Sequence, residues 1–208
     1  VNGCRTKKLL DGRSMLDNLK HYKVILASNS PRRKELLSGL GIQYEVKVLP
    51  DIDESFPPDL TAEEIPQYIS RNKADAYPVE EGELLITADT IVYCKGEVLG
   101  KPVDEADACR MLRQLSGCTH QVVTGVTLKT RQQVHTFSCT TQVTFARLSD
   151  EEITYYVRNY APFDKAGAYG VQEWIGFVGV TRLEGSYFNV MGLPVQRLYT
   201  ELKKMNAI

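Results

Sequence analysis

The chain has 208 residues, which is enough for one α/β domain, or for two small lobes that share a sheet, with a substantial hydrophobic core. Its 25 lysines and arginines nearly balance 26 aspartates and glutamates, and a net charge of -1 gives no overall attraction for a nucleic acid polymer or an anionic membrane. No apolar run is long enough to span a membrane, and no signal peptide pattern stands at the start.

The pattern of cysteines favours a reducing environment, and the spacing of cysteines and histidines excludes the usual ligands of a soft metal ion. Five cysteines, odd in number and without a C-x-x-C spacing, argue against a disulfide framework and against a zinc site. The three histidines are too far apart to show ligand spacing, so a metal would have to sit on carboxylates. We expect a cytoplasmic protein.

Residues 1–14 differ from the rest because they are polar, basic and without clear periodicity. We expect an upstream extension or a segment added for expression, poorly ordered unless something docks it, with Met15 as a candidate natural start. No repeat, low-complexity tract or clean linker interrupts residues 15–208, so we expect a single domain whose two lobes share a sheet.

A strand, a turn and a helix are predicted over residues 24–37, V-I-L-A-S-N-S-P-R-R-K-E-L-L. Ser30 is a suitable N-cap, and the proline after it suits the first helical position. Arg32, Arg33 and the following lysine then crowd the positive end of the helix dipole, at a cost of about 0.3–1 kcal/mol each. A bound anion would remove this cost, because helix N–H groups, guanidinium groups and the Ser28 hydroxyl would form a phosphate cradle. The same residues are equally compatible with a capped surface helix that carries solvated arginines.

Residues 42–49 alternate between apolar and polar side chains and predict a second, half-buried strand. An acidic loop follows, D-I-D-E-S-F-P-P over residues 51–58, and it contains Glu54.

A capping box, T-A-E-E, predicts a helix over residues 61–77 with an apolar stripe of Ile65, Ile69 and Ala76. Lys73 lies on the same stripe, where a solvated lysine is not expected. Either this lysine passes along the stripe to reach water or it points into a polar cleft.

Residues 84–93, L-L-I-T-A-D-T-I-V-Y, are the most strand-like run and predict a central strand covered on both faces. Asp89 lies in the middle of this run. A buried carboxylate is costly unless it is paired or bound to a metal, so Asp89 should have a cationic partner. The alternative is an aspartate in a bulge or turn, although no glycine, proline or asparagine flanks it.

The rest of the chain alternates between further predicted elements. They are a helix over 105–115 capped by Asp104, a hairpin of 121–129 and 133–146, a capping-box helix over 149–160, a strand pair within 175–183, a glycine-rich loop over 185–192, and a last helix opened by Pro194.

The side chains that break local expectation form one chemical inventory. They are the arginine pair at the first helix, Glu54, Lys73, Asp89 and Lys101. Several cations with two carboxylates suit a polyphosphate held together with a divalent metal, because carboxylates bind the metal and cations neutralise phosphate oxygens.

Seven segments resemble, in the same order, the Maf-like nucleoside triphosphate pyrophosphatases. They are L-A-S-N-S-P-R-R-K-E-L-L, D-E-S, N-K-A, A-D-T-I-V, G-E-V-L-G-K-P, H-Q-V-V-T-G-V and F-D-K-A-G-A-Y-G-V-Q. The resemblance implies an α/β fold with an elongated mixed sheet flanked by helices and a cleft between two lobes, as in ITPase-like proteins. It also implies hydrolysis of a nucleoside triphosphate to the monophosphate and diphosphate, dependence on Mg²⁺ or Mn²⁺, and a homodimer.

Carried over residue by residue, the resemblance implies a phosphate-binding turn, two acidic metal positions and two phosphate-facing lysines: Ser28 and Arg33, Glu54 and Asp89, and Lys73 and Lys101. Asp89 is implied as the proton acceptor, and Arg33 and the two lysines complete the implied catalytic set. Whether Asp89 would activate water directly or bind the metal that does so stays open.

Three positions resemble the branch of the family that acts on dTTP and UTP: Arg32, Thr90 and Gln172. The branch that prefers 7-methyl-GTP has an aromatic residue in place of Arg32. The Gln172 amide suits the imide edge of thymine or uracil, because it offers both a donor and an acceptor. The use of this activity in the cell stays open between cleansing of nucleotide pools, regulation, or both.

Two other functions compete with this prediction. One is a pyrophosphatase for modified purine nucleotides such as 7-methyl-GTP. The other is a nucleotide-binding regulator of cell division with little turnover, which would keep the cations but would have little need for Glu54 and Asp89 together.

Overall fold

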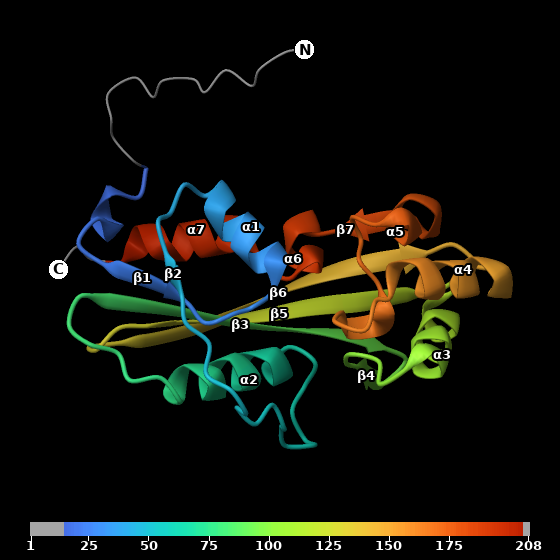
Figure 1. The fold of residues 1–208 in the computed structure, drawn as a ribbon, viewed down its shortest axis with the longest axis horizontal. Coiled ribbons are helices and arrows are strands. Elements are labelled where there is room, and N and C mark those ends of the chain that lie inside the picture. Colours follow the sequence, from blue (N-terminus) through green and yellow to red (C-terminus); the bar gives the residue numbers. More distant parts are fainter. Residues whose placement is uncertain (1–14, 206–208) are drawn as a thin grey trace, which may run out of the picture.

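The computed structural model describes residues 15–205, so the extension predicted at residues 1–14 lies outside the described residues. A seven-stranded mixed sheet runs along the molecule (Figure 1) in the order β2-β1-β3-β5-β6-β7, with β4 paired to β3. The strands are β1 (Lys23–Leu26), β2 (Glu45–Val46), β3 (Glu83–Cys94), β4 (Glu97–Leu99), β5 (Thr119–Lys129), β6 (Val134–Phe145) and β7 (Val180–Glu184). The predicted elongated mixed sheet is confirmed.

Helices cover both faces of this sheet (Figure 1). They are α1 (Pro31–Gly39), α2 (Glu64–Asp75), α3 (Glu105–Leu115), α4 (Asp150–Tyr160), α5 (Trp174–Gly179), α6 (Tyr187–Met191) and α7 (Val195–Lys204), with 3-10 turns at Asp17–Leu19 and Ala166–Ala168. On one face Leu37 of α1 and Leu198 of α7 share a core with Leu26, and on the other Ile65 of α2 packs with Val123.

The central strand β3 has an open edge in its middle. It pairs with β1 only as far as Ile86 and with β4 only from Val92 onward, while its other edge stays paired with β5. Side chains from both faces of residues 87–91 can therefore reach the space beside this edge, although neighbouring residues on a strand point to opposite faces.

Gly125 of β5 lies directly opposite Asp89 of β3 in the antiparallel register. A Cβ atom added at Gly125 would overlap the carbonyl oxygen of Pro66 in α2. The missing side chain therefore lets α2 lie close to the sheet beside Asp89.

We expect Gly125→Ala to lower the free energy of unfolding by about 1–3 kcal/mol, because rotating a side chain cannot relieve a clash with backbone. Urea or thermal unfolding followed by circular dichroism measures the change. Gly39→Ala is the control, since a Cβ at this helical position meets no atom within 4 Å. That variant should be neutral or stabilising by up to about 1 kcal/mol. Equal unfolding midpoints for the two variants would contradict the close approach of α2.

Three expectations about elements were wrong in detail. The strand predicted over 42–49 is only Glu45–Val46, because β2 is an edge strand whose sole neighbour, β1, ends at Leu26. On α2, Ala74 is buried and Ala76 is not, because the helix ends at Asp75. The glycine-rich loop at 185–192 contains helix α6, which Ser186 caps at one end and Gly192 ends with a φ of 114°.

The strand pair predicted within 175–183 is instead helix α5 followed by the single strand β7. Ile175 is fully buried whereas Phe177 is 83% exposed, and Gly176 lies so close to the carbonyl of Val171 that a Cβ would overlap it. The burial of Ile175 against the core, which the local sequence does not reveal, decides the conformation.

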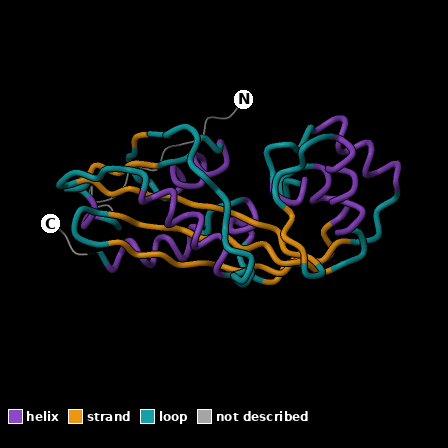
Figure 2. Tube along the Cα trace, turned by 90° about the horizontal axis from the view of Figure 1, so that it is seen from below, coloured by secondary structure: helices purple, strands orange, loops and turns teal. Residues whose placement is uncertain are grey.

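A second core lies under α3 and α4. Leu112, Ile153 and Ile175 pack there against Val92 and Val122 of the sheet. Figure 2 shows the strands running from this group of helices, the small lobe, to the larger group formed by α1, α2 and α7. Each group of helices packs on its own hydrophobic core at one end of the sheet, and the division of residues 15–208 into two lobes stays a prediction.

His120 lies in the core of the small lobe, 1% exposed, with its Nε2 atom 2.7 Å from the hydroxyl of Tyr169. Burial lowers the pKa of His120 from 6.5 to about 4. The unfolded chain therefore takes up a proton at this residue between these pH values while the folded chain does not, and the contribution of His120 to stability is lost as the pH falls through this window.

We expect His120 to account for a loss of up to about 3 kcal/mol in the free energy of unfolding between pH 6.5 and pH 4, at about 1.4 kcal/mol per pH unit. Urea unfolding at a series of pH values measures it. His120→Gln, which cannot titrate, should be less sensitive to pH by this amount, and identical slopes for the variant and the wild type would contradict the argument.

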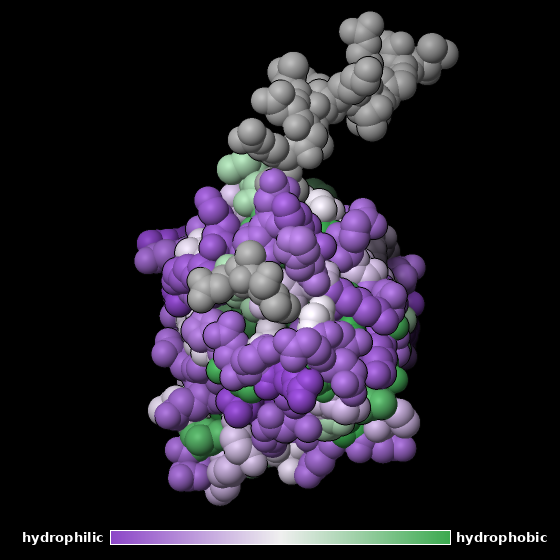
Figure 3. Space-filling view, turned by 90° about the vertical axis from the view of Figure 1, so that its left-hand side faces the viewer, coloured by the Kyte–Doolittle hydropathy of each residue, from purple (hydrophilic) through white to green (hydrophobic). Residues whose placement is uncertain are grey.

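Among residues 15–205, no helix is long and apolar enough to cross a membrane. The end face shown in Figure 3 is predominantly hydrophilic. The four cysteines that the structure describes are free.

Candidate functional site

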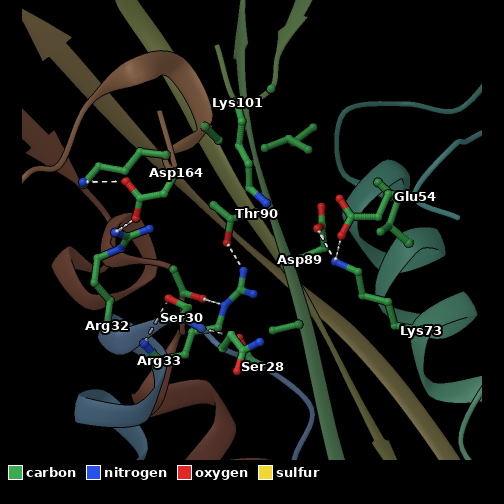
Figure 4. Close-up of a pocket in the computed structure, with 18 of the residues that line it drawn as sticks. Ser28, Ser30, Arg32, Arg33, Glu54, Lys73, Asp89, Thr90, Lys101 and Asp164 are labelled. Atoms are coloured by element: carbon green, nitrogen blue, oxygen red, sulfur yellow. Dashed lines mark hydrogen bonds and ion pairs between the residues drawn. The ribbon is translucent and has the colours of Figure 1, made fainter. Parts of the chain in front are cut away.

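A cleft of about 720 Å³ opens beside the unpaired edge of β3, and every site residue predicted from the sequence lines it. Figure 4 labels these residues except Gln172. These residues are Ser28, Arg32, Arg33, Glu54, Lys73, Asp89, Thr90, Lys101 and Gln172. Residues far apart in the sequence thus meet in one place.

The turn before α1 forms one wall of the cleft. The Ser28 hydroxyl accepts a hydrogen bond from the N–H of Ser30 (3.2 Å), and the Ser30 hydroxyl accepts one from the N–H of Arg33 (3.5 Å). These bonds cap the helix so that its N-terminus faces the cleft, where N–H groups and the helix dipole favour an anion.

The guanidinium of Arg33 is held at two points. Its Nε donates to the carbonyl oxygen of Gly192 (2.8 Å) and its Nη2 donates to the hydroxyl of Thr90 (3.1 Å). Burial lowers the pKa of Arg33, and the nearby charge of Asp89 opposes this shift. Since arginine stays protonated in proteins, Arg33 presents a fixed positive charge with further N–H donors to spare.

On the opposite wall, Lys73 bridges the two acidic residues. Its Nζ lies 2.8 Å from Glu54 Oε1 and 2.8 Å from Asp89 Oδ1. The side chains of Lys73 and Asp89 are each 13% exposed. The predicted cationic partner of Asp89 is confirmed, and Lys73 points into the cleft. Asp89 lies in regular strand pairing, so the bulge or turn alternative is wrong.

Glu54 stands at the more open side of this pair, with 52% of its side chain exposed. Partial burial opposes its ionisation, but the hydrogen bond from Lys73 and the charges of Lys73, Lys101 and Arg33 together lower its pKa below the ordinary value. Lys101 reaches into the cleft (Figure 4) and makes no hydrogen bond or ion pair with the residues that the structure describes. It is a cation available to a ligand.

The first arginine of α1 has a partner that the sequence analysis did not single out. Arg32 Nη1 lies 2.9 Å from Asp164 Oδ2, and Asp164 Oδ1 lies 2.8 Å from the Nζ of Lys165. Burial opposes ionisation of Asp164, but these two cations lower its pKa. The sequence signal for Asp164 was its place in the segment F-D-K-A-G-A-Y-G-V-Q, which resembles the family.

Gln172 lines the cleft in the same segment. Its Oε1 atom is buried and has no hydrogen-bond partner among the described residues. A buried polar atom without a partner is costly, so this acceptor is suited to a ligand donor.

The acidic residues fit a hard divalent ion. Within residues 15–205 no group of three or more His, Cys, Asp or Glu side chains could hold a metal alone. Glu54 and Asp89 nevertheless converge on one point, and Mg²⁺ is commonly held by one or two carboxylates together with substrate phosphates.

Together these features define an α/β protein with a cleft in which lysines and arginines surround a carboxylate pair. The chain belongs to the Maf family, because the family model described as Maf-like protein matches residues 23–205.

Relatives similar to nearly the whole chain carry one name, dTTP/UTP pyrophosphatase. The protein of Phocaeicola vulgatus is 66% identical over 193 residues, 92% of this chain and 100% of its own. That of Flavobacterium johnsoniae is 48% identical over 188 residues, 89% of this chain and 96% of its own. Among solved structures, a HAM1 protein from Coxiella burnetii covers 88% of this chain and 100% of its own at 16% identity, with a TM-score of 0.49.

Proposed function

We propose that the protein hydrolyses dTTP and UTP to the nucleoside monophosphate and diphosphate. The observation that carries this proposal is the convergence of Asp89, Glu54 and the phosphate-suited cations in one cleft. The relatives named dTTP/UTP pyrophosphatase, at 66% and 62% identity, support the substrates.

In this proposal the cations neutralise the phosphate chain. Arg33, Lys101 and the N-terminus of α1 face the space where it would lie, and Lys73 offsets part of the charge of the two carboxylates while staying within the cleft. Positioning and charge neutralisation supply most of the catalysis of phosphoryl transfer.

Asp89 is the proton acceptor. A water oxygen forms a bond to the α-phosphorus, the bond from the α-phosphorus to the bridging oxygen breaks, and diphosphate leaves with that electron pair. The water proton passes to an oxygen of Asp89, which is free to act as a base because Lys73 occupies only its Oδ1 atom.

Glu54 and Asp89 would hold Mg²⁺ or Mn²⁺. When bound, such an ion supplies positive charge to phosphate oxygens and makes a bound water more acidic. Lys73 keeps the two carboxylates side by side, because its Nζ contacts one oxygen of each group.

Arg32, Thr90 and Gln172 recognise the nucleoside. The unpartnered Oε1 of Gln172 can accept a hydrogen bond from the imide N–H that thymine and uracil share, and its amide N–H₂ can donate to a base carbonyl. The proposal further includes a homodimer, as the resemblance implies, and a role in cleansing nucleotide pools. The scattered cysteines favour the cytoplasm, and the net charge of -1 favours no nucleic acid polymer or membrane as a partner.

The test is diphosphate release from a panel of nucleotides with Mg²⁺ or Mn²⁺. We expect the highest kcat/KM for dTTP and UTP, and loss of turnover when a chelator removes the metal. Binding without turnover would favour a nucleotide-binding regulator and overturn the hydrolase proposal. A strong preference for 7-methyl-GTP would overturn the base assignment.

A further inference from the structure

A row of hydrogen bonds leads from the cleft into the core behind Thr90. Arg33 Nη2 donates to the Thr90 hydroxyl (3.1 Å), which lies 2.9 Å from the hydroxyl of Thr124. Thr124 in turn donates to the carbonyl oxygen of Asn189 (3.2 Å). Thr124 is fully buried on β5, directly opposite Thr90, and it does not line the cleft.

Hydrogen-bond chemistry sets the direction of this row. A guanidinium can only donate, a carbonyl oxygen can only accept, and each hydroxyl has one hydrogen. All three contacts are satisfied only when Thr124 donates to Asn189 and Thr90 donates to Thr124. The Thr90 hydroxyl then faces Arg33 and the cleft with lone pairs alone.

The row closes on itself through helix α6. The carbonyl of Asn189 also accepts from the N–H of Gly192 (2.9 Å), and the carbonyl of Gly192 accepts from Arg33 Nε (2.8 Å). Asn189 is fully buried, and its Nδ2 donates to the carbonyl of Val122 and the hydroxyl of Thr141, which fixes α6 on the sheet. Both acceptors that hold Arg33 are therefore tied to the same buried backbone.

We propose that Thr124 is a positioning residue for the hydrolysis: through Thr90 it fixes the guanidinium of Arg33 and keeps the Thr90 hydroxyl as an acceptor only. This inference rests on the proposed function, in which Arg33 faces the phosphate chain. It extends the site to a side chain that touches no substrate.

The test compares three variants of the whole chain with the wild type. Thr124→Val keeps the shape and removes the hydroxyl, and Thr124→Ser keeps the hydroxyl. Thr127→Val is the matched control, because Thr127 is also fully buried on β5 and bonds to the hydroxyls of Ser70 and Thr136, which do not line the cleft.

We expect Thr124→Val to lower kcat about tenfold on dTTP and UTP alike, with KM within about twofold, because one oriented hydrogen bond is lost from the group that holds Arg33. Thr124→Ser and Thr127→Val should stay within about threefold of the wild type. A kcat of Thr124→Val within threefold of the wild type, or an equal loss in Thr127→Val, would overturn the proposal.

Two further arms keep the outcome clear. If Thr124→Val does not fold, Thr124→Ala removes the same hydroxyl with less bulk and is assayed in its place. If the wild type binds dTTP without turnover, the proposed function fails, and the role of Thr124 in hydrolysis fails with it. If the wild type turns over dTTP and Thr124→Val keeps its kcat, only the positioning role fails.

Discussion

Asp89→Asn is expected to lower the rate of diphosphate release by about 10²–10⁴-fold while leaving the fold intact. An amide cannot take a proton from water and is a poorer metal ligand than a carboxylate. The fold should survive because asparagine has nearly the same shape, and Lys73 keeps Glu54 as a partner at 2.8 Å. Diphosphate release from dTTP measures the effect, and circular dichroism with thermal unfolding checks the fold.

Asp75→Asn is the control for the change of charge. Asp75 lies on α2 as Lys73 does, but it pairs with Arg71 at the surface, with 53% of its side chain exposed. This variant should turn over dTTP at the rate of the wild type. If Asp89→Asn did the same, Asp89 would be only a structural partner of Lys73.

The sequence revealed the charged part of the site because its residues conflict with their surroundings. Asp89 interrupts an apolar strand and Lys73 occupies an apolar stripe, so each needs a partner whatever the fold. The structure supplies that partner in both cases through one ion pair. A residue whose environment contradicts its chemistry can be found without knowing which distant segment satisfies it.

Other parts of the site obey local rules and gave no such signal. Thr124 is an ordinary strand residue, and only its place opposite Thr90 links it to Arg33. Gly125 matters because α2 crosses it. Asp164 lies in a loop, where a charged residue needs no explanation until Arg32 is seen beside it. Their roles depend on tertiary contacts that spacing along the chain does not encode.

The same contrast between local sequence signals and tertiary contacts decides which helices could be predicted. Helices α3 and α4 begin where predicted, because Asp104 and Ser149 accept hydrogen bonds from the backbone three residues on. Helix α5 was missed because the burial of Ile175, a tertiary contact, outweighs the strand preference of its neighbours. Local caps are visible in sequence, whereas packing against a remote core is not.

The open edge of β3 explains how one cleft gathers groups from both faces of the sheet. Asp89 reaches α2 on one face and Thr90 reaches α1 on the other, although they are adjacent. If β3 were paired along its whole length, the sheet would separate the side chains of Asp89 and Thr90. In the proposed function, the gap between β1 and β4 would let a polyphosphate reach Asp89, the lysines and the α1 turn at once.

Replacing the two arginines of α1 one at a time should separate catalysis from base selection. Arg33→Ala removes the guanidinium held by Thr90 and Gly192, and we expect kcat to fall by about 10²–10³-fold on every nucleotide. Arg32→Ala should instead change the ratio of kcat/KM between dTTP and 7-methyl-GTP by about tenfold, with a smaller loss of kcat.

The control is Lys34→Ala, which removes the third cation of the same helical turn. Lys34 does not line the cleft, so its loss should leave both kcat and the nucleotide ratio near those of the wild type. Steady-state kinetics on the nucleotide panel measures all three variants. Equal losses on all nucleotides for Arg32→Ala and Arg33→Ala would contradict the division of roles, because both arginines would then act on the phosphate chain that all the nucleotides share.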